Sequence, residues 1–272
     1  MRRRLVVNAD DFGRSRSVNE AVVRAHCDGI LTTASLMVNE PAAAEAVALA
    51  REHPRLGVGL HLTLLDGRAT LPPERLGGLV NGRGEFDRAP VRVGWRYFFR
   101  RELREPLRAE VRAQFAKFRE TGLTLDHVNG HLHLHLHPAV LPTVIEEMER
   151  TGARHARLTR DPFWLEARLA GGRWLYRAAH AVVFFGLARA AARRFRAHGL
   201  RHTDRVFGLL QHGRVDEAYV LRLLERLPPG DSELYAHPSL DEFEHEFRAL
   251  ISPRVRRRVA ENGIQLVRYG DL

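Results

Sequence analysis

Residues 5–38 read LVVNADDFGRSRSVNEAVVRAHCDGILTTASLMV, and this stretch decides the fold. Residues 5–9 are apolar and predict a strand, while residues 18–27 carry apolar side chains at helical spacing and end before Gly29. Residues 32–38 predict a second strand. Alternation of strand and helix at this spacing is typical of βα units, whose strands form a parallel sheet. The stretch therefore predicts an α/β fold.

The same alternation continues almost to the end of the chain. Further strands are predicted at 57–62, 125–131, 155–158, 205–210, 233–236 and 264–268, and further helices at 42–51, 103–121, 140–150, 216–227 and 253–262. Seven or eight βα units in 272 residues fit a distorted TIM-like (β/α) barrel with a parallel sheet better than an open sheet. Because no linker divides the chain, we expect a single domain over residues 1–272. It would carry a Gly- and Pro-rich loop at 66–90 and a helical insertion at about 161–203.

The charge balance is unusual, with 43 basic residues against 33 acidic ones and Lys117 as the single lysine. Such a balance invites a nucleic-acid or anionic-membrane partner, but a coding bias toward arginine produces the same composition. The sequence has no basic stripe interleaved with aromatic residues and no recognised nucleic-acid motif. We therefore expect no nucleic-acid partner.

The cysteine content and the hydropathy of the chain indicate in which cellular compartment we expect the protein. Cys27 is the single cysteine, so no internal disulfide framework is expected. The longest uncharged apolar stretch, residues 178–188, is far shorter than the roughly 20 residues that a spanning helix needs. We expect a cytoplasmic protein.

Polar side chains fall where predicted strands end. Asp10 and Asp11 end the first strand, His61 lies near the end of the third, and His237 follows the strand at 233–236. Each of these residues alone has an ordinary structural explanation. In a parallel barrel, however, the carboxyl ends of the strands meet at one face, where catalytic groups lie. The pattern therefore predicts that these side chains converge.

The strongest signal is the run DHVNGHLHLHLHP at 126–138. Its histidines at 131, 133, 135 and 137 alternate with apolar residues, so an extended backbone would place all four on one face. Imidazole is a common ligand for zinc and similar metals. The alternative is an exposed polar face of an edge strand. We expect one or two of these rings to bind metal, and the spacing alone does not assign which.

Together these residues indicate a mononuclear metal site with open positions for water and substrate. A metal ion lowers the pKa of bound water to about 7, a spare carboxylate can act as a base, and a spare histidine can protonate a leaving amine. This inventory matches hydrolysis of an amide or ester. Arg157 and Arg160, which lie at the end of the predicted strand at 155–158 and just after it, are candidates to orient a catalytic carboxylate.

Five motifs in order carry a family resemblance: NADDFG at 8–13, TTASLMVN at 32–39, GLHL at 59–62, DHVNGHLH at 126–133 and ELYAHP at 233–238. In these motifs the chain resembles the YdjC-like carbohydrate deacetylases. Members of that family have a distorted βα barrel and remove acetyl groups from N-acetylated sugars with a divalent metal ion. The resemblance implies one such ion, with zinc, magnesium and manganese all open.

Carried onto this chain, the resemblance makes Asp11, His61 and His131 the metal ligands, Asp10 the general base and His237 the general acid. Many members read Asp-Ser-His-His-His where this chain has Asn-Gly-His-Leu-His at 129–133. That departure affects the residues around the ligands rather than the ligands themselves. Roles in substrate binding or in supporting the ligands are expected for Asn129, His133, His135, Arg157 and Arg160.

The motifs at 32–38, 59–73 and 125–138 are more similar still to the hopanoid biosynthesis-associated branch of that family. This implies an N-acetylglucosaminyl hopanoid lipid, such as N-acetylglucosaminyl bacteriohopanetetrol, as substrate. Residues 174–200 are apolar in the middle and arginine-rich afterwards, with Trp174, Tyr176, Phe184 and Phe185 near their start and centre. A basic amphipathic segment is typical of membrane-surface binding. We expect peripheral contact with the inner face of the cytoplasmic membrane, the alternative being a core-packing helix with a solvated basic end.

Other functions stay open at this point. A soluble chito-oligosaccharide deacetylase of the diacetylchitobiose type would use the same chemistry on a different substrate. A non-enzymatic metal-storing or metal-sensing protein could be built on the histidine run, and a nucleic-acid-binding protein is suggested by charge alone. The residues make no prediction of oligomeric state.

Overall fold

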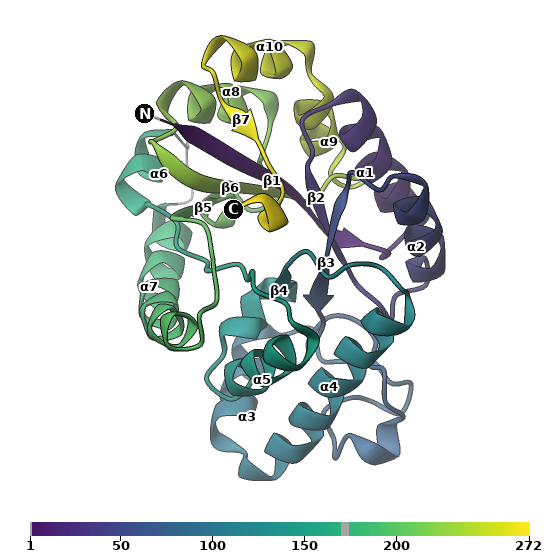
Figure 1. Cartoon of the computed structure of the whole chain (residues 1–272). Coiled ribbons are helices and arrows are strands. Elements are labelled where there is room, and N and C mark those ends of the chain that lie inside the picture. The colour runs from purple at the N-terminus through teal and green to yellow at the C-terminus, as the bar shows by residue number, and fades with distance from the viewer. Residues whose placement is uncertain (1, 170–173) are drawn as a thin grey trace.

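The computed structural model describes residues 2–169 and 174–272, and a curled parallel sheet lies at its centre (Figure 1). The strands are β1 (Arg3–Phe12), β2 (Thr33–Leu36), β3 (Gly57–Leu62), β4 (Val128–Gly130), β5 (Arg205–Phe207), β6 (Gly230–Ala236) and β7 (Gln265–Leu266). Their order is β4-β3-β2-β1-β6-β5, every pair is parallel, and β7 pairs with the first half of β1. The predicted α/β fold with a parallel sheet is confirmed.

The helices lie around the outside of this sheet (Figure 1). They are α1 (Arg16–Asp28), α2 (Ala43–Glu52), α3 (Pro90–Phe99), α4 (Arg104–Glu120), α5 (Leu141–Thr151), α6 (Phe163–Leu169), α7 (Trp174–Ala197), α8 (Glu217–Arg226), α9 (Glu244–Ile251) and α10 (Pro253–Glu261). Local sequence explains several helix starts: Ser15 caps α1 and Asp216 caps α8 through side-chain oxygens that accept backbone N–H bonds. None of the helices in the described ranges is long and apolar enough to cross a membrane.

An irregular segment spans the open side of the half-barrel. Val128 of β4 donates to the carbonyl of His155 at 2.9 Å, and Val206 of β5 donates to the carbonyl of Arg160 at 3.1 Å. The segment 155–160 therefore joins the two edge strands, β4 and β5. The strand expected at 155–158 is wrong as a regular strand, because these residues form isolated bridges to Val128 and Arg201 instead. The barrel is distorted at this point.

The largest difference from expectation lies after β4. The strand expected at 125–131 is short, ending at Gly130, and residues His131–Leu136 form 3₁₀ turns (η3) that are kinked at Leu132 and His133. Helices α3 and α9 also lie where no helix was predicted, at the end of the Gly- and Pro-rich loop and after His237. Helices α6 and α7 fall inside the 161–203 segment, whose status as an insertion stays a prediction.

Packing of this framework positions the carboxyl ends of the strands. Residues 5–12 of β1 are all buried, since β2 and β7 pair with one edge of the strand, β6 pairs with the other, and helices cover the sheet. Asp10 and Asp11 near the end of β1, His61 near the end of β3 and His237 just after β6 therefore come to one end of the barrel. That placement follows the rule for parallel barrels.

Candidate active site

A β-bulge at the end of β1 explains how two adjacent aspartates serve one site. Adjacent strand residues normally point to opposite faces, but the register between β1 and β2 shifts between Ala9 and Phe12. Asp11 takes a positive φ of 65°, which a residue other than glycine adopts only under constraint. The bulge re-aims the side chains, so Asp10 and Asp11 reach different partners at the same end of the barrel.

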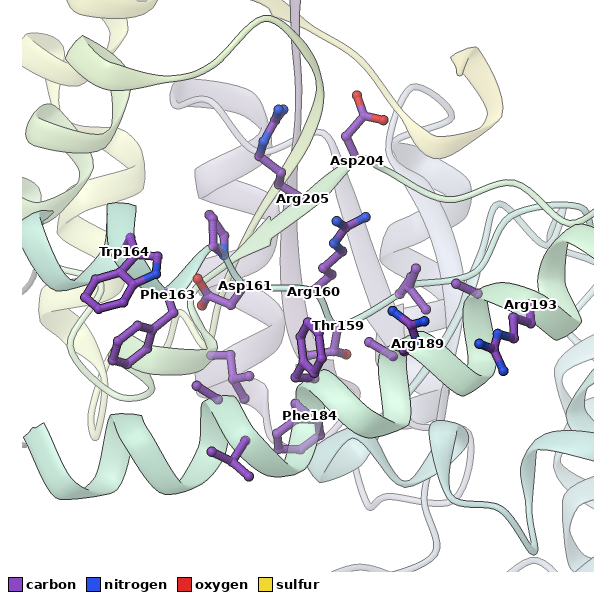
Figure 2. Close-up of a pocket in the computed structure, with 18 of the residues that line it drawn as sticks. Thr159, Arg160, Asp161, Phe163, Trp164, Phe184, Arg189, Arg193, Asp204 and Arg205 are labelled. Carbon is purple, nitrogen blue, oxygen red and sulfur yellow. The ribbon is translucent and has the colours of Figure 1, made fainter.

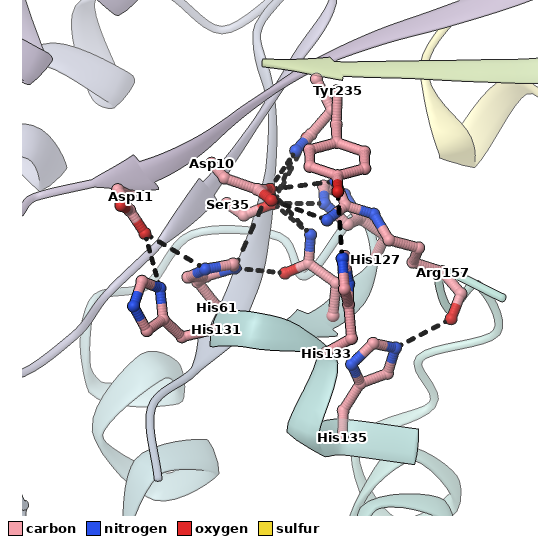
Figure 3. Close-up of polar contacts among 12 residues, drawn as sticks. Asp10, Asp11, Ser35, His61, His127, His131, His133, His135, Arg157 and Tyr235 are labelled. Atoms are coloured by element: carbon pink, nitrogen blue, oxygen red, sulfur yellow. Dashed lines mark hydrogen bonds and ion pairs between the residues drawn. The ribbon is translucent and has the colours of Figure 1, made fainter. Parts of the chain in front are cut away.

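Asp11 contacts two histidines from different strand ends (Figure 3). Its Oδ1 lies 3.0 Å from Nδ1 of His131 and 3.3 Å from Nε2 of His61. His61 donates through Nδ1 to Oδ1 of Asn129 at 2.7 Å, which leaves its Nε2 directed at Asp11. A hydrogen bond from the other ring nitrogen is how metal-binding histidines are usually oriented.

The three residues fit a divalent metal ion. Each offers one ligand atom, these atoms all lie within 4.8 Å of one another, and all three side chains are buried. Nε2 of His131 has no hydrogen-bond partner among the described residues and lies 3.9 Å from Asp66. Burial disfavours a charged ring, but Asp11 and Asp66 outweigh it and raise the pKa of His131 to about 9. The position therefore favours a cation, whether a proton or a metal ion.

Asp10 lies beside this cluster in a buried ion pair. Arg157 donates to both of its oxygens, at 2.7 and 3.0 Å, and Asn8 and Asn129 donate to Oδ1 at 2.8 and 3.1 Å. Burial raises the pKa of a carboxyl, but the Arg157 guanidinium outweighs it and holds the pKa of Asp10 far below its usual range. Arg157 also donates to Glu233 at 2.7 Å. Asp10 is therefore held as a charged carboxylate of fixed direction.

The surroundings of His237 shift its pKa in the opposite direction to that of Asp10. Glu246 lies 3.8 Å from its Nδ1 and also accepts its backbone N–H at 2.6 Å. Burial works against a charged ring, yet the Glu246 carboxylate raises the pKa of His237 above its ordinary value. The neighbouring ring of His212 stacks edge-on at 4.6 Å, and burial lowers its pKa to about 4. An ionised Asp10 and a His237 ring whose protonated form is favoured by Glu246 thus lie beside the Asp11–His61–His131 cluster.

The histidine run does not form the single face that its spacing predicts. Leu132 and His133 take positive φ values of 47° and 60°, which turn the chain between successive rings. His131 reaches Asp11, His133 contacts the Tyr235 hydroxyl at 3.1 Å, and His135 donates to the carbonyl of Arg157 at 2.9 Å. Burial lowers the pKa of His133 and of His135, so both rings are neutral. The prediction of a shared extended face was wrong.

The fourth ring of the run and one arginine lie away from the cluster. His137 contacts the carbonyl of Gly94 at 3.2 Å, on α3. Arg160 is exposed and lines a cavity on the outer side of the barrel, so it does not orient Asp10 as expected. The side chains of Trp174 and Tyr176, expected at a lipid interface, lie outside the described residues.

Several residues of the site were not predicted. Asp66 faces His131 and Arg14, with hydrogen bonds and charges that lower its pKa to about 2. Ser35 accepts from Asn129 at 2.8 Å, and Glu246 anchors His237. Asp66 and Ser35 lie in or beside motifs that the sequence analysis quoted, so position in a motif was the available signal. No such signal was available for Glu246, because it lies on helix α9, which was not predicted.

A family model described as YdjC-like protein matches residues 4–261. The chain belongs to the YdjC-like family. Among the curated relatives, the carbohydrate deacetylase of Mus musculus is 34% identical over 99% of this chain and 94% of its own length. That of Brevibacillus brevis is 42% identical over 54% of this chain and 56% of its own length.

A solved structure agrees with the fold of this YdjC-like chain. A protein of Enterococcus faecalis V583, described as a cellobiose-phosphate cleavage protein, superposes with a TM-score of 0.76. The match covers 100% of this chain and 99% of the other at 22% identity. At that identity the likeness establishes the fold alone.

Proposed function

We propose that this protein is a metal-dependent carbohydrate N-deacetylase, which hydrolyses the acetamide of an N-acetylglucosaminyl group to acetate and the free amino sugar. The observation that carries the proposal is the buried cluster of Asp11, His61 and His131 at the carboxyl ends of the strands. Oδ1 of Asp10 lies 3.9 Å from Nδ1 of His61, and the charges of Asp10 and Asp11 help to raise the pKa of His237. The relatives from Mus musculus and Brevibacillus brevis are both named carbohydrate deacetylase, which supports the same chemistry.

Each residue has a task in the hydrolysis. A divalent ion held by Asp11, His61 and His131 would acidify a water molecule and polarise the acetyl carbonyl. Asp10 accepts a proton from the attacking water as its oxygen bonds to the acetyl carbon. His237 donates a proton to the nitrogen as the C–N bond breaks, so the amine leaves neutral and acetate remains.

The charges around the site suit these two proton transfers. Arg157 keeps Asp10 ionised and fixed in direction, so the carboxylate is in the form that a general base requires before the reaction begins. Glu246 raises the pKa of His237, so the ring is ready to donate one. Environments that push the pKa values of two groups apart are typical of acid and base partners in one active site.

The substrate and metal can be proposed more narrowly. Two imidazole ligands and one carboxylate favour zinc over magnesium. The motifs at 32–38, 59–73 and 125–138 favour a hopanoid carrying N-acetylglucosamine, taken from the cytoplasmic face of the membrane. Exposed apolar side chains on α7, including Val182 and Phe185 at 75% and 67% exposure, support contact with a lipid phase.

The test measures acetate release from an N-acetylglucosaminyl lipid and from diacetylchitobiose, each with and without a chelator. We expect acetate from the lipid, loss of that acetate with chelator, and recovery on adding zinc back. Turnover of diacetylchitobiose alone would replace the lipid substrate with a soluble chito-oligosaccharide. Absence of acetate from both substrates in the zinc-loaded protein would overturn the proposed activity.

A further inference from the structure

A large cavity lies on the outer side of the barrel, between α7 and the segment 158–164 (Figure 2). Its volume is about 1260 Å³, above the range of about 300–1,000 Å³ typical of small-molecule pockets. None of Asp10, Asp11, His61, His131 or His237 lines it. The cavity is therefore a feature separate from the candidate active site.

The sequence of α7 explains why this space is not filled by the protein's own side chains. Ala178, Ala181, Ala188 and Ala192 of α7 all line the cavity. Methyl groups at these positions are too short to fill the space between the helix and the barrel wall, where Leu158 lies. Because lining side chains such as Val182 and Phe185 are also exposed, the space is open to solvent on one side, and its apolar lining is suited to an apolar guest.

The cavity is apolar at one end and basic at the other. Phe163 and Trp164 lie at one end, and Arg189 and Arg193 lie at the other (Figure 2). The order along α7 is similar, with an apolar run over residues 181–188 followed by arginines at 189, 193, 194 and 196. In the described part of the chain, neither Arg189 nor Arg193 forms an ion pair with a carboxylate. The basic end therefore has charge available for an anion.

Acidic groups in the lining offset this charge only in part. The lining contains five arginines and two aspartates, Asp161 and Asp204. Burial and the nearby Glu166 carboxyl raise the pKa of Asp161 well above its ordinary value, which favours the uncharged form of this carboxyl. Asp204 accepts the backbone N–H of Asp231 at 2.9 Å. The cavity as a whole thus favours a negatively charged ligand.

We propose that this cavity binds one long-chain anionic amphiphile, with its acyl chain between α7 and the barrel wall and its head group on Arg189 and Arg193. A long-chain fatty acid and an anionic phospholipid share this chemistry. Exposed Val182 and Phe185 line the cavity as well and give an apolar path to its interior. The inference does not depend on the proposed deacetylase activity, because it uses none of the catalytic residues.

The bound ligand would lie against the wall of the active site. Thr159 and Phe184 line the cavity, and both contact His133: the Thr159 hydroxyl lies 3.2 Å from Nδ1, and the Phe184 ring centroid lies 5.2 Å from that of His133. His133 in turn contacts Tyr235. An acyl chain beside Phe184 would therefore lie one side chain away from His133.

Binding of cis-parinaric acid, a fatty acid that fluoresces in apolar surroundings, tests the proposal on the full-length protein. We expect binding to saturate near one fatty acid per chain. The double variant Arg189→Glu/Arg193→Glu should bind the acid roughly tenfold more weakly, because two charge-assisted contacts are lost. The matched control is Arg194→Glu, an exposed arginine on the same helix that does not line the cavity. It should bind within about twofold of the wild type.

Further measurements test which chemical features of the ligand are needed for binding. Ala181→Trp should block the acyl chain and abolish binding, and the methyl ester of parinaric acid should bind weakly because it has no charge. Vesicles with and without phosphatidylglycerol separate the sources: binding confined to the anionic vesicles, with the same dependence on Arg189 and Arg193, assigns a membrane lipid. Equal binding of acid and methyl ester, or equal weakening by Arg194→Glu and by the double variant, would overturn the proposal.

Discussion

Arg157→Met tests how the buried ion pair supports the site. Arg157 is fully buried and donates to Asp10 and to Glu233, with its guanidinium 4.3 Å from the Tyr235 ring centroid. Methionine keeps much of the side-chain volume and removes the charge. Two buried carboxylates then lose the cation that they share, and removal of one partner from a buried pair costs about 3–5 kcal/mol.

That loss is measurable as a change in thermal stability. For a domain of about this size, 1 kcal/mol lowers the Tm by roughly 2–4 °C, so the variant should melt roughly 6–20 °C below the wild type. Arg108→Met is the control, because Arg108 is 41% exposed and forms ion pairs with Glu105 and Glu146 at the surface. Such surface pairs contribute about 0–1 kcal/mol.

The pH dependence gives the sharper test. In the wild type, the pKa of Asp10 in the folded state lies below its value in the unfolded state. The contribution of Asp10 to the free energy of unfolding is therefore present above the unfolded-state pKa and is lost as the pH falls through the folded-state pKa. In the variant, burial without Arg157 raises the pKa of Asp10 above its unfolded value. The penalty is then full at neutral pH and shrinks as pH falls through that raised pKa, where the carboxyl becomes neutral.

Urea unfolding followed by circular dichroism, at about pH 7 and about pH 4.5, measures the difference in unfolding free energy between variant and wild type at each pH. We expect a smaller difference at the lower pH. A penalty below about 1 kcal/mol at neutral pH, or one that does not change with pH, would refute the reasoning.

Three further predictions concern the catalytic groups. His61→Ala or His131→Ala removes one of three ligands and should strip the divalent metal from the purified protein, as elemental analysis would show. Asp10→Asn should keep the metal but lower kcat by roughly 10²–10⁴-fold, since the base is lost. Glu246→Gln removes the charge that favours the imidazolium of His237 and lowers its pKa, so the alkaline limb of the kcat/KM profile should move to lower pH.

Matched controls make these results interpretable. His137→Ala removes a histidine of the same run that contacts Gly94 instead of Asp11, and it should keep its metal. Metal retained in both ligand variants would contradict the ligand assignment, and wild-type turnover in Asp10→Asn would remove Asp10 as base. An alkaline limb that stays in place in Glu246→Gln would mean that another group supplies the proton.

Much of the fold could be predicted because its signal is local. The apolar runs at 5–9, 32–38 and 57–62 and the helical spacing between them correspond to β1, β2, β3, α1 and α2 of the structure. Parallel topology then places their carboxyl ends together, which is why Asp11 and His61 could be expected at one site. Helix α9 was missed, and with it the role of Glu246.

The histidine run shows where local pattern fails. Alternation of His and Leu at 131–136 is the period of a strand, yet the chain forms a 3₁₀ helix there, with positive φ at Leu132 and His133. Positive φ in residues other than glycine costs about 1–3 kcal/mol each, and the surrounding structure must supply it. Here this cost is offset by three buried contacts, from His131 to Asp11, from His133 to Tyr235 and from His135 to Arg157.

The sequence alone determined a parallel α/β barrel, an excess of arginine over acidic residues, and a set of aspartates and histidines at strand ends. Only the tertiary structure decided what those residues contact: the bulge that separates Asp10 from Asp11, the ion pair of Asp10 with Arg157, and the cavity beneath α7. The physical reason is that periodicity records which face a residue takes within its own element. Contacts between residues distant in the chain depend on register shifts, strained backbone and packing gaps, which leave no periodic trace in the sequence.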